Sequence, residues 1–331
     1  MATVLVTDGI YQPGERGGMS LLEEAGVTLR FVALPPNTPT ADMIHHLQGC
    51  FAVIASSQQY TDDLFTALPD LCVVARLGVG YDAVDIPAAT RHGVSVLTTP
   101  GTLEWAVADH TMGMIIALAH QIVKADRAIR QGNWQAFYML DVWRKTLGLV
   151  GLGRIGQMVA QRARAFDMRV LAHERRPDMA FVEKHGIELV PLDDLLAQSD
   201  FVSLHVPLTE ETRGLIDARR LALMKPHAYL INTARGTLVD EDALFEALQS
   251  GRLGGAGLDV RVNEPPTDTR FAELDNVVAT PHMAGLTDGR RLACGIMTAE
   301  GILHVLRGER PEGLVNPEVW ERPNLRLPRG E

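Results

Sequence analysis

Residues 145–174 read KTLGLVGLGRIGQMVAQRARAFDMRVLAHE, and this stretch decides the fold. The apolar run at 146–150 is typical of a buried parallel strand. Gly151, Gly153 and Gly156 follow it in G-x-G-x-x-G spacing. In this motif the first glycine permits a tight turn, the second lets backbone approach a pyrophosphate, and the third packs helix against strand. The stretch therefore predicts a strand, a phosphate-binding turn and a helix.

The residues after the glycines extend the pattern. A helix is expected there, because four apolar residues share one of its faces: Ile155, Val159, Ala163 and Phe166. A second strand at 169–173 then delivers Glu174, eighteen residues after Gly156. An acid at this position can accept hydrogen bonds from the hydroxyls of an adenosine ribose. The register predicts a dinucleotide site, and the alternative is a glycine-tight turn without a ligand.

Length and composition restrict the class of protein. A chain of 331 residues favours two domains. Its net charge of −10 argues against general binding to nucleic acid or anionic membranes. No apolar run is long enough to span a bilayer, and the chain starts in a strand pattern rather than a signal peptide. Cys50, Cys72 and Cys294 have neither disulfide-framework nor metal-site spacing, so a reduced cytoplasm is expected and no metal.

The first hundred residues alternate between strand and helix patterns. Strands are expected at 3–7, 29–33, 52–55, 72–76 and 94–97, with helices at 19–25, 41–47, 63–67 and 87–91. Such alternation predicts a parallel sheet covered by helices, with ligands beyond the carboxyl ends of the strands. The loop after the fourth strand is Leu77, Gly78, Val79 and Gly80. Its backbone amides suit an anion, and a plain glycine turn is the alternative.

A long apolar segment follows. Residues 103–130 predict one helix that is apolar on nearly every side, hence buried between domains or subunits. The aromatic stretch NWQAFYMLDVW at 133–143 either caps the chain's own core or meets a partner subunit, and we favour the partner. After the glycine-rich unit, strands are expected at 188–190, 201–205, 228–232, 256–260 and 277–279. Helices are expected at 192–197, 218–224, 241–249 and 288–307.

Three polar residues each follow a predicted strand of the second part. Arg235 follows AYLINTA, Glu264 lies beyond GLDVRV, and His282 follows VVATP. A histidine can move a proton near neutral pH, a carboxylate beside it stabilises imidazolium, and an arginine can clamp a substrate carboxylate. This set suits interconversion of a 2-oxo and a 2-hydroxy acid. The alternatives are a surface salt-bridge arginine, an exposed loop acid and a loop histidine.

The motifs GLGRIG, NTARG, GLDV, NEPP and TPH stand in the order and spacing of the D-isomer-specific 2-hydroxyacid dehydrogenases, and the chain resembles that family over nearly its whole length. The likeness is greatest to the phosphoglycerate dehydrogenase and hydroxypyruvate reductase branches. It implies an α/β protein with a Rossmann-type NAD-binding domain (99–286) and a discontinuous flavodoxin-like α/β substrate domain (1–98 and 287–331). It also implies NAD as cofactor, a small anionic substrate and a homodimer.

The resemblance also implies roles for individual residues. Arg235 would bind substrate, His282 would be the acid/base and Glu264 its partner. Asp259, which could otherwise simply cap a loop, would meet the nicotinamide amide. The substrate carboxylate would meet Leu77, Gly78, Val79 and Gly80. The cofactor would be lined by Val79, Gly151, Gly153, Arg154, Ile155, Gly156, Glu174, His205, Val206, Pro207, Thr233, Ala234, Asp259 and Gly285.

Departures from the family pattern bear on the substrate. Phosphoglycerate dehydrogenases usually carry an arginine after the third strand, which holds the substrate phosphate. This chain has Ala55-Ser56-Ser57 at that place. Glu104 would repel a phosphate dianion if it faced the ligand. Arg261 replaces a common phenylalanine. We expect a small unphosphorylated D-2-hydroxy or 2-oxo acid; the alternatives are phosphoglycerate oxidation and a dinucleotide-sensing corepressor.

The choice between NAD and NADP depends on the end of the second strand of the glycine-rich unit. Glu174 would face the 2′-phosphate of NADP as one anion against another, which favours NAD. Arg175 and Arg176 follow directly and could clamp that phosphate instead. Because Glu174 holds the strand-end position, NAD is predicted and NADP is the less favoured cofactor.

Overall fold

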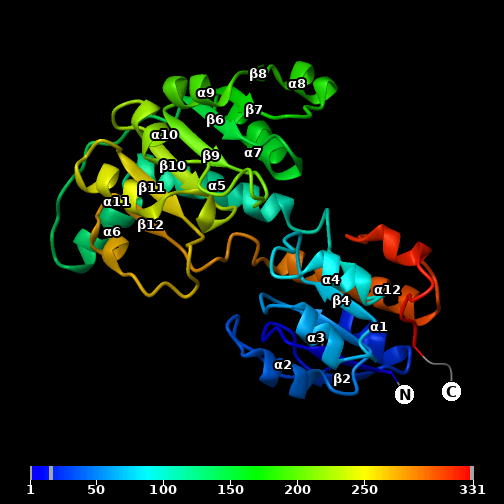
Figure 1. The fold of residues 1–331 in the computed structure, drawn as a ribbon. Helices are drawn as coiled ribbons and strands as arrows, with labels where there is room; N and C mark the ends of the chain where they lie inside the picture. The colour runs from blue at the N-terminus through cyan, green and yellow to red at the C-terminus, as the bar shows by residue number, and fades with distance from the viewer. Residues whose placement is uncertain (1, 15–17, 329–331) are drawn as a thin grey trace. The chain divides into compact units, whose positions relative to one another are not determined.

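The computed structural model describes residues 2–14 and 18–328 (Figure 1). The chain divides into two compact units, one of Met1–Leu103 with Thr287–Glu331 and one of Glu104–Leu286. The first boundary lies five residues after the predicted residue 98, and the second lies at the predicted residue 286. Residues 1, 15–17 and 329–331 of the predicted substrate domain lie outside the described residues.

The first unit is built on a parallel sheet. Its described strands have the order β2-β1-β3-β4-β5, which is the flavodoxin-like order. All four strand pairings are parallel in register. The strands are β1 (Thr3–Val6), β2 (Thr28–Phe31), β3 (Ala52–Ala55), β4 (Val73–Arg76) and β5 (Ser95–Leu97).

Helices cover this sheet and enclose two apolar clusters. One cluster includes Val4 and Ile302, and the other includes Leu5 and Phe65, so neighbouring residues of β1 supply opposite faces of the sheet. The elements are α1 (Gly18–Glu24), α2 (Thr40–Leu47), α3 (Asp62–Ala67), α4 (Ile86–Arg91), α12 (Asp288–Leu306) and the 3₁₀ turn η3 (Pro317–Glu321). The helix α12 therefore returns the chain to the first unit, packing against α1.

The second unit contains a larger parallel sheet. Its described strands have the order β12-β11-β10-β9-β6-β7-β8. The order reverses between β6 and β9, which is the Rossmann switch point. The strands are β6 (Thr146–Val150), β7 (Arg169–His173), β8 (Glu188–Leu189), β9 (Phe201–Leu204), β10 (Tyr229–Asn232), β11 (Gly255–Leu258) and β12 (Val277–Ala279). The two sheets confirm the predicted fold class.

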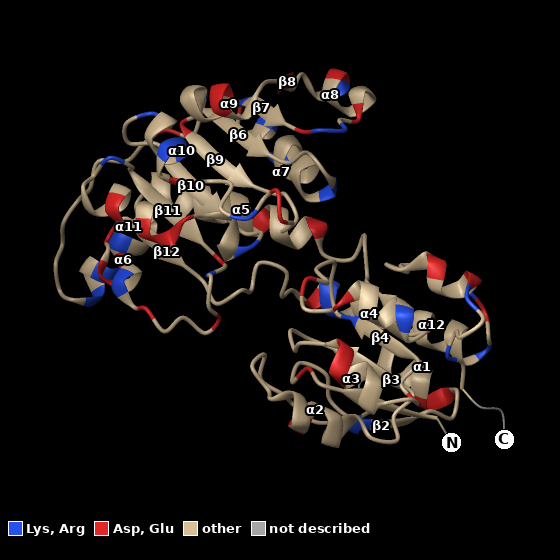
Figure 2. Ribbon diagram, in the orientation of Figure 1, with Lys and Arg blue, Asp and Glu red and all other residues tan. Residues whose placement is uncertain are grey.

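Helices pack on both faces of the second sheet. They are α5 (Glu104–Ala119), α6 (Ile122–Arg130), α7 (Arg154–Ala165), α8 (Met179–His185), α9 (Leu192–Gln198), α10 (Ala218–Leu223) and α11 (Glu241–Gln249), with 3₁₀ turns η1 (Gly236–Leu238) and η2 (Arg270–Glu273). The helix α8 was not predicted. Strands β6, β9, β10 and β11 bury almost every residue, and Figure 2 shows them largely without charged residues, which lie mostly on helices and loops.

The single helix predicted at 103–130 is wrong. The chain forms α5 and α6, which are bent by 62° relative to each other, and Gln121 between them adopts the left-handed region at φ 50°. The predicted burial holds only for α5, which packs against α7, β10, β11 and β12 within its own unit. None of the nine residues of α6 is buried.

The membrane prediction was based on run length. Among the described residues, a test of length and apolar character finds no single helix able to cross a membrane, and one bent pair, α5 with α6, that passes it. Because α5 is largely buried within the protein, its apolar character is that of a core helix, and such helices also pass a test of this kind.

The aromatic stretch at 133–143 is irregular in structure. Val142 is 5% exposed and packs with Leu140 against a core cluster of the second unit. The side chains of Trp134, Tyr138 and Trp143, in contrast, are exposed, with Trp134 at 95%. The stretch therefore covers its own core with aliphatic residues and presents aromatic residues outward.

Candidate active site

The glycine-rich turn between β6 and α7 is built as its spacing predicted. Gly151 has φ 99°, and a Cβ there would lie 2.7 Å from the carbonyl of His205. A Cβ on Gly156 would lie 2.3 Å from the Gly151 oxygen. A Cβ on Gly153, in contrast, would meet nothing within 4 Å among the described residues, its chain neighbours aside. Two glycines thus close the turn against neighbouring backbone, and the middle one leaves open space.

The N-terminus of α7 suits an anion. Gly153 is its N-cap, and no side chain among the described residues caps it. Arg154 is exposed and Ile155 is half-buried at its first turn. The uncapped amides, the positive end of the helix dipole and the space at Gly153 fit a pyrophosphate.

Glu174 lies at the end of β7, beside the glycine turn. Its Oε2 accepts from the Leu152 amide at 2.9 Å and its Oε1 from the Arg176 amide at 3.0 Å. Burial alone would raise the pKa of Glu174, but these amide hydrogen bonds outweigh it and lower the pKa. The Arg175 guanidinium pairs with Glu211 at 2.5 Å. The carboxylate is therefore ionised and fixed, and Arg175 is engaged elsewhere.

The ends of β9 and β10 carry the next predicted residues. His205 follows β9, and its Nε2 lies 2.9 Å from Ser203 Oγ. Burial lowers the pKa of His205 to about 4, so its ring is neutral at pH 7. Val206 beside it is half-buried and Pro207 is exposed. These residues and those after β10 lie at the carboxyl edge of the sheet, where ligands of such folds bind.

Arg235 follows β10 by a short, hydrogen-bonded turn. Asn232 Oδ1 accepts from the Ala234 amide at 3.1 Å, and Asn232 Nδ2 donates to the Arg235 carbonyl at 2.8 Å. Thr233 Oγ1 lies 3.1 Å from Thr111 Oγ1 on α5. A buried asparagine therefore fixes the backbone from which the Arg235 side chain extends.

Glu264 and His282 come together although they follow different strands. Oε2 of Glu264 lies 2.6 Å from Nδ1 of His282. Burial alone would raise the pKa of Glu264, but the hydrogen bond and charge of His282, and further the Arg261 amide, lower it. Arg235 acts on the pKa of Glu264 in the same direction through its charge. The three residues predicted to carry the chemistry are thus electrostatically coupled within one unit.

Asp259, at the end of β11, holds the segment that carries His282. Its Oδ1 accepts from Thr280 Oγ1 at 2.6 Å and from the Met283 amide at 2.9 Å, while Oδ2 accepts from the Ala284 amide at 2.9 Å. The His282 amide donates to the Asp259 carbonyl at 2.7 Å. The loop-organising role is therefore present in the structure. Contacts of Asp259 and of the half-buried Gly285 with a nicotinamide stay predictions.

The predicted anion loop lies in the first unit, after β4. The Leu77 amide donates to Ala55, and the Gly78 amide, at φ 132°, donates to Thr99 Oγ1 at 3.0 Å. The amides of Val79 and Gly80 make no hydrogen bond to any described residue. Of the four predicted amides, two are therefore used by the fold and two have no hydrogen-bond partner among the described residues.

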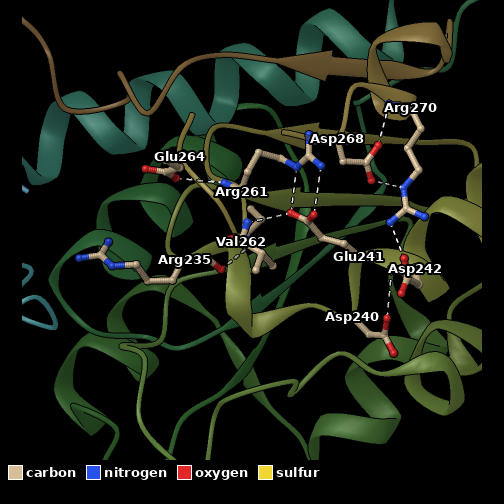
Figure 3. A network of polar contacts seen from close by, with 10 residues as sticks. Arg235, Asp240, Glu241, Asp242, Arg261, Val262, Glu264, Asp268 and Arg270 are labelled. Atoms are coloured by element: carbon tan, nitrogen blue, oxygen red, sulfur yellow. Dashed lines mark hydrogen bonds and ion pairs between the residues drawn. The ribbon is translucent and has the colours of Figure 1, made fainter. Parts of the chain in front are cut away.

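Two arginines near these sites were not predicted to have a role. The buried Arg290 of α12 donates from Nη2 to the Leu77 carbonyl at 2.8 Å and so lies beneath the anion loop. Arg261, noted in the sequence only as a departure, pairs with Glu241 (Figure 3). Each arginine is distant in sequence from its partner, so the sequence did not predict either contact. Only the unusual residue type at position 261 indicated that this place differs from the family pattern.

Comparison with known proteins places the chain. Residues 112–284 match the family described as D-isomer specific 2-hydroxyacid dehydrogenase, NAD binding domain. A glyoxylate reductase of Korarchaeum cryptofilum is 42% identical over 315 residues, which cover 92% of this chain and 94% of that protein. A D-3-phosphoglycerate dehydrogenase of Methanocaldococcus jannaschii is 38% identical over 320 residues, 96% of this chain but 60% of that longer protein.

A solved structure extends the likeness to the whole fold. The D-lactate dehydrogenase from Aquifex aeolicus, complexed with NAD and lactic acid, superimposes with a TM-score of 0.84 at 28% identity, covering 95% of this chain and 99% of that one. Sequence and fold agree over both units. The chain thus belongs to the D-isomer specific 2-hydroxyacid dehydrogenase family and is an oxidoreductase that transfers hydride between a nicotinamide dinucleotide and small hydroxy or oxo acids.

Proposed function

We propose that this protein uses NADH to reduce a small, unphosphorylated 2-oxo acid, such as glyoxylate or hydroxypyruvate, to the D-2-hydroxy acid. The observation that carries the proposal is the 2.6 Å contact between Glu264 and His282, beside Arg235. A carboxylate, an imidazole and a guanidinium are together able to bind an anionic carbonyl compound and to deliver a proton to its oxygen.

The contact supports Nε2 of His282 as the nitrogen that exchanges the proton. Since Nδ1 is engaged by Glu264, Nε2 is the atom that donates the proton to the carbonyl oxygen during reduction and accepts it during oxidation. A nicotinamide dinucleotide, when bound, would supply or accept the hydride that the substrate C2 carbon gains or loses. The Glu264 carboxylate, kept ionised by its lowered pKa, stabilises the protonated ring. Arg235 binds the substrate anion and polarises the carbonyl.

The substrate carboxylate is assigned to the amides of Val79 and Gly80. These two amides have no partner among the described residues, so their hydrogen-bonding capacity is available. Arg290 supports the assignment, because its buried guanidinium holds the Leu77 carbonyl and adds positive charge beneath the loop. A net acidic protein needs such local positive charge to attract an anion.

The residues present fit a dinucleotide, and we assign NAD rather than NADP. The turn at Gly151 to Gly156 and the uncapped start of α7 would hold the pyrophosphate. Glu174 would accept the ribose hydroxyls, and its ionised carboxylate would repel a 2′-phosphate. The ion pair of Arg175 with Glu211 supports this choice, since it directs that guanidinium to another acid.

The preference for an unphosphorylated acid rests on the segment after β3. Ser56 and Ser57 carry no charge to neutralise a phosphate. The Ser56 amide is already used within the fold, since it donates to Thr7 Oγ1 at 3.3 Å. Similarity to a glyoxylate reductase over 94% of that protein supports the same choice. Phosphohydroxypyruvate is the second candidate, favoured by the match to a phosphoglycerate dehydrogenase.

A homodimer completes the proposal. Trp134 and Tyr138 are almost fully exposed, and the neighbouring α6 exposes Ile122 and Ile129. Exposed apolar side chains that are contiguous along a segment are typical of a subunit interface. We also place the protein in a reducing compartment, because its three cysteines are buried and unpaired.

Initial rates of NADH oxidation test this function. The panel is glyoxylate, hydroxypyruvate, pyruvate, 2-oxoglutarate and phosphohydroxypyruvate at saturating NADH. We expect the highest kcat/KM with glyoxylate or hydroxypyruvate. A higher value with phosphohydroxypyruvate would favour the second candidate. Tight NADH binding with negligible turnover on every acid would instead indicate a dinucleotide sensor.

A further inference from the structure

A largely shielded ion pair lies beside Glu264 without belonging to the proposed catalytic set. Arg261 donates from Nε to Oε1 of Glu241 at 2.8 Å and from Nη2 to Oε2 at 3.0 Å, as Figure 3 shows. The two side chains are only 13% and 17% exposed. A two-pronged arginine–carboxylate contact fixes orientation as well as distance, and water screens a shielded pair little. The pair is therefore suited to holding backbone in place.

Both ends of the pair are anchored. Glu241 is the first residue of α11, and its neighbour Asp240 caps the helix by accepting from the amides of Asp242 and Ala243 at 3.1 Å. The guanidinium of Arg261 also lies 4.4 Å over the ring of the buried Phe271. The carboxylate of Glu241 thus projects from a capped helix start, and its partner is held by a core ring.

The pair reaches Glu264 through the backbone of one short loop. Oε1 of Glu241 also accepts from the Val262 amide at 2.9 Å. The Arg261 amide donates to Oε1 of Glu264 at 3.0 Å, which leaves Oε2 for His282. Glu241 therefore bonds to two consecutive residues of the loop, Arg261 and Val262, and the amide of Arg261 in turn bonds to Glu264.

The same loop is packed tightly against the residue that follows Arg235. A Cβ on Gly236 would lie 2.0 Å from the carbonyl carbon of Arg261, so glycine is required for this approach. Arg235 and Glu264 thus extend from two backbone segments in direct contact. A shift of the loop would change the position of Glu264 relative to both Arg235 and His282.

We infer that Glu241 is a positioning residue, which acts through Arg261 and the Val262 amide to hold the Glu264 carboxylate against His282. This inference rests on the proposed roles of Glu264 and His282. It assigns a catalytic consequence to an ion pair outside the proposed catalytic set. Misplacing a catalytic group by about 1 Å can cost a reaction ~10²-fold in rate, so a clamp of this kind affects turnover.

Three variants weaken to different degrees the contacts of Glu241 with Arg261 and with the Val262 amide. Glu241→Ala removes both tethers, Arg261→Met removes the guanidinium but keeps most of the chain that covers Phe271, and Glu241→Gln keeps an acceptor for the Val262 amide. We expect kcat for 2-oxo acid reduction to fall about 10- to 100-fold in Glu241→Ala. In Arg261→Met kcat should fall less than in Glu241→Ala, and in Glu241→Gln it should lie between the values of Glu241→Ala and wild type. NADH affinity should stay unchanged, since neither residue is among those predicted to contact the cofactor.

The pH dependence separates positioning from loss of stability. In Glu241→Ala the pH–rate profile for reduction should move toward lower pH, in the direction produced by Glu264→Gln. In the double variant Glu241→Ala/Glu264→Gln the profile should move no further than in Glu264→Gln alone, because Glu241 acts only through Glu264. Thermal unfolding of each variant shows that it is folded at the assay temperature; Arg261→Met carries the test if Glu241→Ala is not.

Asp242→Asn is the matched control. Asp242 is adjacent to Glu241, pairs with Arg270 in the same network and has a side chain that is 83% exposed, but it makes no hydrogen bond or ion pair with the loop at 261–264 (Figure 3). Its kcat and pH profile should stay within about twofold of wild type, as expected for an exposed ion pair.

The outcomes distinguish this inference from the proposed function. A Glu264→Gln variant with an unmoved pH profile would overturn the proposed role of Glu264 itself. If Glu264→Gln moves the profile while folded Glu241→Ala and Arg261→Met keep the wild-type kcat and profile, only the positioning role is overturned.

Discussion

Nδ1 of His282 lies 2.6 Å from Oε2 of Glu264, and the other carboxylate oxygen of Glu264 accepts from the Arg261 amide. The imidazole is therefore held by a carboxylate that is itself held by backbone. His282 adopts φ 51°, a left-handed conformation that non-glycine residues seldom occupy, and its amide bonds the Asp259 carbonyl. Glu264, Arg261 and Asp259 thus define how the His282 ring is presented.

Replacing Glu264 by Gln should shift the pH–rate profile of reduction. The lowered pKa of Glu264 keeps it anionic across the neutral range, where it favours the protonated form of the pair. Gln removes this charge, so His282 loses its proton at a lower pH. The rate of reduction should therefore begin to fall at a lower pH than in wild type. Oxidation of the hydroxy acid should change in the opposite sense. Profiles of kcat/KM in both directions check this, and two profiles that coincide with wild type would contradict it.

Arg235→Lys should impair the substrate step selectively. Lysine keeps the charge but loses the planar fork that binds a carboxylate through two hydrogen bonds. We expect kcat/KM for the oxo acid to fall about 10²-fold or more, with NADH affinity measured by fluorescence titration unchanged. A parallel loss of NADH affinity would place Arg235 in the cofactor site instead.

Glu174→Ala should narrow the preference for NADH over NADPH. Wild type should prefer NADH by several tens-fold, about 2 kcal/mol, because the ionised carboxylate binds the ribose hydroxyls and repels a 2′-phosphate. Values of kcat/KM with both cofactors provide the measurement. A wild-type preference for NADPH would show that Arg175 and Arg176 set the choice.

His205 should make the protein less stable in mild acid. Its folded-state pKa is lowered to about 4, so between about pH 6.5 and pH 4 the unfolded chain binds a proton that the folded chain does not. The free energy of unfolding should fall by about 1–3 kcal/mol as pH decreases through this window. Urea unfolding at pH 7 and pH 4.5 should show a smaller fall in His205→Gln; an equal fall in both proteins would assign the effect to other groups.

Much of the fold was predictable because buried parallel strands leave continuous apolar runs, and both sheets follow them. The break between α5 and α6 was missed because the apolar pattern continues across it and Gln121 is no glycine or proline. The helix α8 was missed although its ends carry cap signals. Asp178 accepts from the Phe181 amide at its start, and Gly186 is left-handed at its end.

The candidate site was predictable only where residues follow strands directly. Arg235 and His282 stand one turn beyond β10 and β12, so the parallel sheet brings them to one edge. The pairing of Glu241 with Arg261 depends on how α11 packs beside the loop after β11, which no local pattern encodes. The same holds for Arg290 beneath the Leu77 carbonyl, since 213 residues separate the two.

The most direct test of the central claim is kcat of His282→Ala with NADH and hydroxypyruvate, measured beside NADH affinity. General acid catalysis contributes ~10²–10⁴-fold, so kcat should fall by at least ~10²-fold while NADH binds as in wild type. A folded His282→Ala enzyme that keeps kcat within a few-fold of wild type would show that another group delivers the proton and would contradict the account.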